Sequence, residues 1–207
     1  GMTVMAPMDE SELVSMLDFA LNMDGPVAIR YPRSSVIGGK EQIESLPVTL
    51  GKGVVLREGR DAAIIALGSM VCPSLEAASI LEKEGLDVAV ANARFAKPVD
   101  EFLVVELAKK YRKVLVAEEA SVIGGLGSAV ADIISGRVKG KVDFAHIGIP
   151  DDFVTHGPRE LLLEKCRLST SGLVEAVSRM CRPKSAASMT CEVTQSLATG
   201  VEGVTQP

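Results

Sequence analysis

Two arginines stand on either side of a Tyr-Pro pair at the end of a short apolar run, in the sequence Arg30-Tyr31-Pro32-Arg33. Proline fixes its own φ angle and ends a strand, so Arg33 projects from a rigid corner. Guanidinium groups bind phosphates and carboxylates through paired hydrogen bonds, which suits two arginines at a strand end. The alternative is that both arginines pair with acidic residues at a domain interface, and spacing alone leaves the two interpretations equally open.

Three further groups could carry chemistry. Residues 92–98 form a second cationic strand end, for which a structural ion pair near a domain face is the favoured interpretation. Glu118 and Glu119 could act as general acid or base, but neighbouring carboxylates at a strand end more often cap loops or pair with arginines. His156 could be catalytic, although a lone loop histidine is more often a hydrogen-bonding residue.

The segment 114–134, VLVAEEASVIGGLGSAVADII, combines an apolar strand at 114–117, the acidic pair, a glycine turn and a helix. Glycine tolerates the backbone angles and close packing of a sharp turn. We expect Ser128 to cap the helix and Gly136 to end it. The turn fits neither G-x-G-x-x-G nor G-x-x-x-x-G-K-[ST], so a structural turn is favoured over a ligand loop.

Composition narrows the class of protein. The 207 residues are 47% hydrophobic but only 3% aromatic, which predicts an aliphatic core of the kind found in parallel sheets. The net charge of −5 gives no electrostatic basis for binding nucleic acid or an anionic membrane. No apolar run is long enough to span a membrane.

The four cysteines are scattered, with no C-x-x-C pair, and only two histidines are present. A metal site built from these residues is therefore not expected. Thiols without a disulfide pattern suit a reducing compartment, and we expect a cytoplasmic protein.

The order of elements predicts the organisation of the chain. A strand near 3–6, a helix at 10–23 and a strand at 27–31 form one βαβ unit, with Asp9 as helix cap and Glu12 completing a capping box. A unit of this size cannot bury enough surface to be stable alone. We therefore predict the end of a truncated domain at 1–33, a linker at 34–52, a main domain at 53–182 and a flexible tail at 183–207.

Within residues 53–182, strands alternate with helices, which predicts an α/β fold with a mostly parallel sheet. The predicted strands are 54–57, 62–67, 88–92, 114–117 and 142–146. Closing helices are predicted at 158–165 and 170–180. Because the turn at 58–61 is short, the strand before it should pair antiparallel at an edge of the sheet.

Six segments together resemble the 1-deoxy-D-xylulose-5-phosphate synthase family. They are MAPMDESEL, PVAIRYPR, GKGVVLREG, ANARFAKPVD, VAEEASVIGGLGSAV and GIPDDFVTHG. The resemblance covers about residues 2–180 and corresponds to the carboxyl-terminal part of the family, from the end of its pyrimidine-binding domain. The EE…GGLGS pattern is shared with transketolases and with beta subunits of 2-oxo-acid dehydrogenases. The resemblance implies a three-layer sandwich like the transketolase carboxyl-terminal domain.

The resemblance also implies an activity for the parent enzyme. That activity is the thiamine-diphosphate-dependent condensation of pyruvate with glyceraldehyde 3-phosphate, with release of carbon dioxide, which supplies isoprenoid and thiamine precursors. The second arginine of RYPR, Arg33 here, is implied to contact the phosphate of the aldehyde, with Arg30 in support. This chain has Ser34 where the family usually has glycine.

The family holds Mg²⁺ and the cofactor diphosphate through a G-D-G…N motif, which this chain lacks. The family's activating glutamate and catalytic histidines lie upstream of Met2. We therefore expect no cofactor, metal or catalytic residue in this chain alone. Its expected role is packing, support of a parent homodimer and closure of one side of the active site, together with the missing amino-terminal domains. The alternatives are a non-catalytic binding or assembly module, or a fragment of a transketolase or 2-oxo-acid dehydrogenase subunit.

Overall fold

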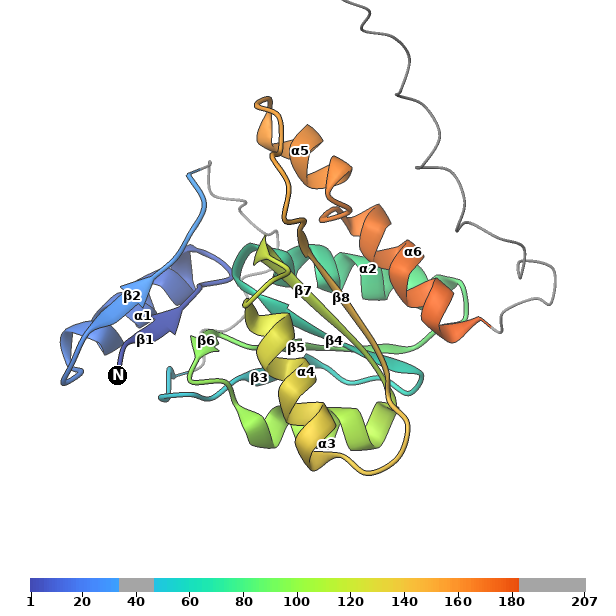
Figure 1. Cartoon of the computed structure of the whole chain (residues 1–207), viewed down its shortest axis with the longest axis horizontal. Helices are drawn as coiled ribbons and strands as arrows, with labels where there is room; N and C mark the ends of the chain where they lie inside the picture. Colours follow the sequence, from blue (N-terminus) through green and yellow to red (C-terminus); the bar gives the residue numbers. More distant parts are fainter. Residues whose placement is uncertain (34–46, 183–207) are drawn as a thin grey trace, which may run out of the picture.

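The computed structural model describes residues 1–33 and 47–182. These residues form two sheets, a small one of three strands and a large one of five (Figure 1). The predicted tail and most of the predicted linker, residues 34–46, lie outside the described residues. The predicted division into domains therefore stays a prediction.

The large sheet has the order β3-β5-β4-β7-β8. Its strands are β3 (Val54–Arg57), β4 (Ala62–Leu67), β5 (Val88–Asn92), β7 (Lys113–Ser121) and β8 (Asp143–Ile149). Strands β5, β4, β7 and β8 run parallel, and β3 runs antiparallel to β5. The predicted α/β class, with a mostly parallel sheet and an antiparallel edge strand, is confirmed.

The neighbour of that edge strand differs from the expectation. β3 pairs with β5, not with β4, the strand that follows the short turn. The backbone amides of Arg60 and Asp61 both donate to the carbonyl of Asp87, at 2.9 and 2.8 Å. Gly59 passes so close to β5 that a Cβ there would lie 2.3 Å from the backbone nitrogen of Ala89. The turn therefore crosses the start of β5, which places β5 between the two strands.

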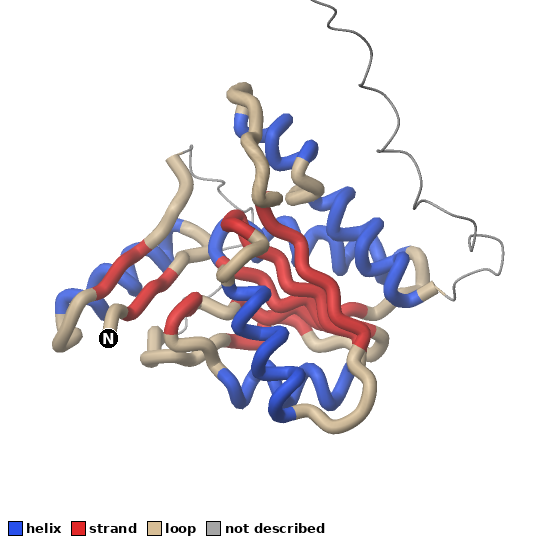
Figure 2. The backbone as a smooth tube through the Cα atoms, in the orientation of Figure 1, coloured by secondary structure: helices blue, strands red, loops and turns tan. Residues whose placement is uncertain are grey.

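Helices cover both faces of the large sheet, which gives three layers (Figures 1 and 2). Helices α2 (Val71–Lys83) and α6 (Thr170–Cys181) pack on one face, and α3 (Glu101–Tyr111) and α4 (Leu126–Arg137) on the other. All six residues of β4 are buried, with alternate side chains in the two cores. A parallel strand covered on both faces is expected to be this uniformly apolar. The remaining elements are the 3-10 turn η1 (Gly68–Met70) and α5 (Arg159–Lys165).

The small sheet has the order β2-β1-β6. Its strands are β1 (Thr3–Met5), β2 (Val27–Ile29) and β6 (Phe95–Lys97), and α1 (Glu10–Leu21) connects the first two. Strands β1 and β2 are parallel, as a βαβ unit requires, and β6 joins from the main part of the chain in the antiparallel sense. The core of this unit is formed by Met5, Met16 and Phe95.

Helix α1 begins as predicted, with one difference in the cap. Asp9 accepts a hydrogen bond from the amide of Glu12 at 2.8 Å. The carboxylate of Glu12 does not return to Asp9 but accepts from the amide of Met8 at 2.7 Å. Glu12 is also 2% exposed and reaches Arg94, so its main role is in the contact between the two sheets.

A candidate substrate-facing site at the switch point of the sheet

A cavity of about 150 Å³ lies where the small sheet meets the large one. From β4, the chain passes through α2 to β5 on one side, and then through α3 to β7 on the other. The carboxyl ends of β4 and β7 therefore flank the switch point of the sheet, where open α/β sheets bind their ligands. The lining residues are Ala6, Arg30, Tyr31, Pro32, Leu67, Gly68, Ser69 and Glu119.

The residues that follow β2 form one wall of this cavity. The amide of Arg30 donates to the carbonyl of Met5 at 2.8 Å, which extends the pairing of β2 with β1 by one bond. Pro32 follows, and the guanidinium-bearing side chain of Arg30 is exposed. Arg33 is also exposed and is not among the lining residues. The corner thus brings Arg30, rather than Arg33, to the cavity in this arrangement.

The carboxylate of Glu119 lies on the opposite side of the cavity. Oε1 of Glu119 accepts a hydrogen bond from Nε of Arg159 at 3.0 Å. Oε2 accepts from Nη2 of the same guanidinium and from the hydroxyl of Ser69. A guanidinium that binds both oxygens of a carboxylate fixes its orientation. Arg159 begins α5, so this contact ties the 150–158 loop and α5 to the cavity.

Glu118 points to the other side of β7 and is 1% exposed. Its Oε1 lies 3.0 Å from Nε2 of His146 and accepts from the amide of Gly127 at 2.9 Å. Burial by itself raises the pKa of Glu118, but the hydrogen bonds from His146, Gly127 and Leu126 outweigh it and hold the pKa below its usual value. Glu118 therefore stabilises the first turn of α4 as a buried carboxylate at a helix N-terminus.

The glycine turn has a structural explanation. A Cβ at Gly125 would lie 2.4 Å from Oε1 of Glu118, and one at Gly127 would lie 2.3 Å from the ring of His146. Gly124 has a φ of 74°. Close packing on a carboxylate and an imidazole thus accounts for these glycines, which agrees with the favoured interpretation of a structural turn.

Two expectations about α4 are wrong. The helix begins at Leu126, so Ser128 lies inside it, where its hydroxyl accepts from the amide of Gly124 at 3.0 Å. Glu118 supplies the cap from the neighbouring strand instead. Gly136 also lies within the helix, which continues to Arg137.

The second cationic strand end is structural, as favoured. Nε of Arg94 lies 2.7 Å from Oε1 of Glu12, with 4% and 2% of the two side chains exposed. The side-chain amide of Asn92 donates to both oxygens of the same carboxylate. The carboxylates Glu118 and Glu119 likewise make the cap and the arginine contact that the favoured interpretation describes. His156 is exposed in the 150–158 loop, and its predicted role stays untested.

Charged and polar groups lie on two sides of the cavity. Arg30 supplies a positive charge on one wall, while Arg159 neutralises Glu119 on the other. Ser69 donates to Glu119, so its remaining lone pairs can accept from a ligand hydroxyl.

Among residues 1–33 and 47–182, no group of three or more His, Cys, Asp or Glu is arranged to hold a metal ion. Nor is any helix in these ranges long and apolar enough to cross a membrane.

Sequence analysis missed the partners of the two glutamates. Ser69, His146 and Arg159 come from three separate elements, and each reaches Glu118 or Glu119 only through tertiary contacts. The strand order β4-β7-β8 places Leu67 opposite Glu118 and Val116 opposite His146. Only Ser69 could have been anticipated from the sequence, because it lies just beyond the end of a buried strand.

Comparison with known sequences places most of the chain in one family. The profile described as "Transketolase, C-terminal domain" matches residues 51–173. The 1-deoxy-D-xylulose-5-phosphate synthase of Pelotomaculum thermopropionicum is 44% identical over 177 residues, which is 86% of this chain and 28% of the relative. The synthase of Gloeobacter violaceus is also 44% identical, over 180 residues, with the same two coverages. The chain thus spans a little more than a quarter of the length of these curated relatives.

Comparison with solved structures agrees on the fold. A structure described as "Split gene transketolase, inactive beta4 tetramer" superposes with a TM-score of 0.75 and is 38% identical, covering 87% of this chain and 57% of that chain. Transketolase from Campylobacter jejuni superposes with a TM-score of 0.64 at 23% identity, covering 86% of this chain and 26% of that chain, and supports the fold alone.

Proposed function

We propose that this chain, which belongs to the family of transketolase carboxyl-terminal domains, is the carboxyl-terminal part of a 1-deoxy-D-xylulose-5-phosphate synthase. The observation that carries the proposal is the 44% identity to synthases over 86% of the chain. The alignment with synthases covers 177 residues and is therefore longer than the segment 51–173 that matches the transketolase profile. Part of the similarity to synthases thus lies outside that domain. The parent reaction would be the condensation of pyruvate with glyceraldehyde 3-phosphate, which depends on thiamine diphosphate and Mg²⁺.

The proposed contribution of this chain is one side of the substrate site. Arg33 and Arg30 would bind the phosphate of glyceraldehyde 3-phosphate, with Arg33 as the direct contact. Both side chains are exposed on the corner after β2 and can therefore reach a ligand outside the chain. Ser69 and Glu119, on the opposite side of the cavity from Arg30, would help to fix the position of residues 30–33.

The cofactor does not fit the residues described. Mg²⁺ requires several oxygen ligands at short range, and the sequence has no G-D-G motif. No three-ligand group exists among the described acidic, histidine and cysteine side chains. We therefore propose that the chain alone does not hold the cofactor and is inactive.

The partners we propose are the amino-terminal domains of the parent and a second copy of it in a homodimer, in the cytoplasm. One surface supports a missing neighbour. Val14, Leu17 and Leu21 share one face of α1 and are 65%, 48% and 86% exposed. Exposed apolar stripes of this kind mark protein-interaction surfaces, so a neighbouring domain packed against α1 would bury these three side chains.

The test has two parts. Thiamine diphosphate with Mg²⁺ is titrated by calorimetry into this chain, whose fold is checked by circular dichroism, and no binding heat is expected. The intact parent is then assayed with pyruvate and glyceraldehyde 3-phosphate. Formation of 1-deoxy-D-xylulose 5-phosphate supports the assignment, while transfer of a two-carbon unit between sugar phosphates without use of pyruvate overturns it.

The arginine roles are tested in the same parent. Arg33→Gln should raise the KM for glyceraldehyde 3-phosphate about tenfold or more, since a charge-assisted hydrogen bond is lost, and should leave the KM for pyruvate nearly unchanged. Arg30→Gln should have a smaller effect. Arg137→Gln removes an exposed arginine of α4 and serves as the matched control. Equal effects of the three variants would exclude a phosphate contact at the corner.

A second candidate is a subunit of a two-chain transketolase. The 38% identity to the split-gene transketolase chain, over 87% of this chain, favours it. The enzyme would then form only when a separate chain supplies the cofactor site. The assay of sugar-phosphate transfer distinguishes this candidate from the synthase.

A further inference from the structure

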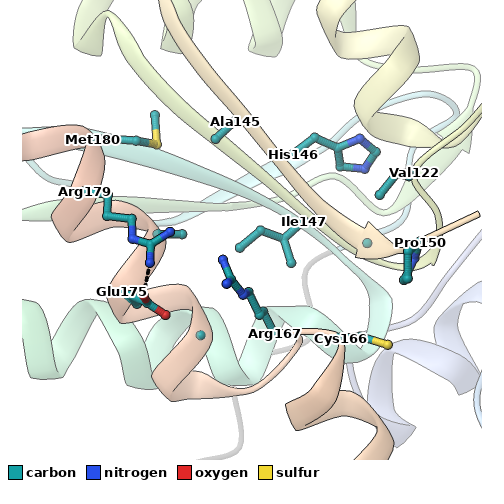
Figure 3. A pocket seen from close by; sticks show the side chains of 13 residues that line it. Val122, Ala145, His146, Ile147, Pro150, Cys166, Arg167, Glu175, Arg179 and Met180 are labelled. Carbon is teal, nitrogen blue, oxygen red and sulfur yellow. Dashed lines mark hydrogen bonds and ion pairs between the residues drawn. The ribbon is translucent and has the colours of Figure 1, made fainter. Parts of the chain in front are cut away.

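A groove of about 380 Å³ runs between β8, the last strand of the large sheet, and α6 (Figure 3). Most of its lining residues come from β8, from α6 and from the connection between α5 and α6. A volume of this size is within the range of sites for small organic ligands. The groove is separate from the cavity at the switch point, with no lining residue in common.

The body of the groove is apolar. Ala145 and Ile147 are alternate residues of β8, so both side chains point to the face that carries α6. Ala176 and Met180 are one helical turn apart and line the opposite wall from α6. Among the described residues no strand pairs with the outer edge of β8.

One end of the groove is cationic. Arg167 projects into it from the connection between α5 and α6, as Figure 3 shows, and has no ion pair among the described residues. Its backbone is fixed in the left-handed region, with a φ of 60°. The backbone also packs tightly on α6, since a Cβ at Gly172 would lie 2.3 Å from the carbonyl oxygen of Arg167. The N-terminus of α6 adds positive potential at the same end, where Gly172 lines the groove.

The other end carries no net charge. Arg179 and Glu175 lie on successive turns of α6 and pair with each other. In Figure 3, Met180 and Arg179 lie on the side of Ala145, Glu175 lies between Arg179 and Arg167, and Cys166 lies toward Pro150. The groove therefore combines an apolar floor, the ion pair of Arg179 with Glu175 on α6, and the guanidinium of Arg167, which has no ion pair among the described residues.

We propose that this groove binds a small amphipathic anion, with a carboxylate at Arg167 and an aliphatic chain along β8 and α6. The guanidinium can bind both oxygens of a carboxylate. The aliphatic chain covers Ile147, Ala145 and Ala176 and removes their apolar surface from water. Arg167 and the apolar walls all belong to this chain, so binding at the groove does not depend on the proposed synthase reaction.

The experiment titrates hexanoate, octanoate and decanoate into the full chain and follows binding by calorimetry and by amide chemical shifts. Each methylene buried in the groove should strengthen binding about fourfold, so octanoate should bind about 15-fold tighter than hexanoate. The shifts should concentrate at Ile147, Gly172 and Ala176. Octan-1-ol, which has the same chain and no charge, should bind about tenfold more weakly than octanoate.

Two variants test the geometry. Arg167→Gln should weaken octanoate about tenfold and leave octan-1-ol unchanged, whereas Arg137→Gln, an exposed arginine on the opposite face of the sheet, should change neither. Ala176→Leu narrows the groove and should weaken both ligands. The proposal is overturned if the folded chain shows no saturable binding, if octanoate and octan-1-ol bind equally, or if Arg137→Gln weakens octanoate as much as Arg167→Gln does.

Discussion

Glu12 and Arg94 are 82 positions apart in the sequence, and Nε of Arg94 lies 2.7 Å from Oε1 of Glu12 in a nearly fully buried ion pair. Glu12 belongs to the small βαβ unit, and Arg94 lies just after β5 of the large sheet. Asn92 also donates to the carboxylate, at 3.0 Å. The pair thus joins the two sheets by a charge contact from which water is excluded.

Removal of the arginine should therefore be costly. Arg94→Met leaves the carboxylate of Glu12 buried without its charge partner, and we expect a loss of about 3–5 kcal/mol in the free energy of unfolding, measured by urea denaturation. The double variant Glu12→Gln with Arg94→Met should recover part of this loss because no buried charge remains. Arg137→Ala breaks an exposed ion pair with Glu101 and should cost less than about 1 kcal/mol. Equal losses in the two arginine variants would contradict the buried role.

The two glycines of α4 give a matched pair of substitutions. Gly127→Ala places a Cβ 2.3 Å from the ring of His146 and should destabilise the chain by about 1–3 kcal/mol. Gly136→Ala lies in the same helix, meets nothing within 4 Å, and should stabilise it by about 0.5–1 kcal/mol. Thermal unfolding of both variants gives the comparison. A stabilising Gly127→Ala would show that the imidazole can move aside freely.

The sequence was sufficient to predict the class of fold because the determining patterns are local. The uniformly apolar run Ala62–Leu67 and the alternation of strands with helices require a covered, mostly parallel sheet, and the structure has one. The neighbour of β3 could not be predicted in the same way. It depends on Gly59 crossing β5, a contact between segments that are distant in sequence.

The site shows the same limit. The arginine corner and the acidic pair stand out by residue type, because both follow apolar strands. Their partners do not, since Arg159 reaches Glu119 only after α5 folds back over the carboxyl end of β7. Ser128 has the residue type of a helix cap, but Glu118 from the adjacent strand satisfies the amide of Gly127 instead. Tertiary contacts therefore decided the roles that local propensity left open.

The buried carboxylate of Glu118 predicts a pH dependence of stability. Its folded pKa lies below the usual value of about 4.3, so the unfolded state binds more protons in this window and stability rises with pH. The contribution is complete above that usual value and is lost as pH falls through the folded pKa. Glu118→Gln should cost about 1–3 kcal/mol at neutral pH, and the difference from wild type should shrink as pH falls below about 4.

The measurement for Glu118 is urea denaturation of both proteins between pH 7 and pH 3. The groups that face this carboxylate are His146 and the amides of Leu126 and Gly127, so the pH dependence belongs to this cluster. Glu160→Gln changes an exposed glutamate of α5 and should give a small difference that does not vary with pH. A constant deficit for Glu118→Gln across the whole range would show that the charge of Glu118 contributes nothing.

The contact between Arg159 and Glu119 predicts how α5 is held against the sheet. Arg159→Gln removes the two-pronged contact, and the amides of α5 should exchange hydrogen about five- to tenfold faster, since this partly exposed charge-assisted contact no longer opposes local opening. Hydrogen exchange followed by mass spectrometry gives the rates. Arg179→Gln removes an exposed arginine of α6 and should leave α5 unchanged. Unaltered exchange of α5 in Arg159→Gln would mean that apolar packing alone fixes this helix.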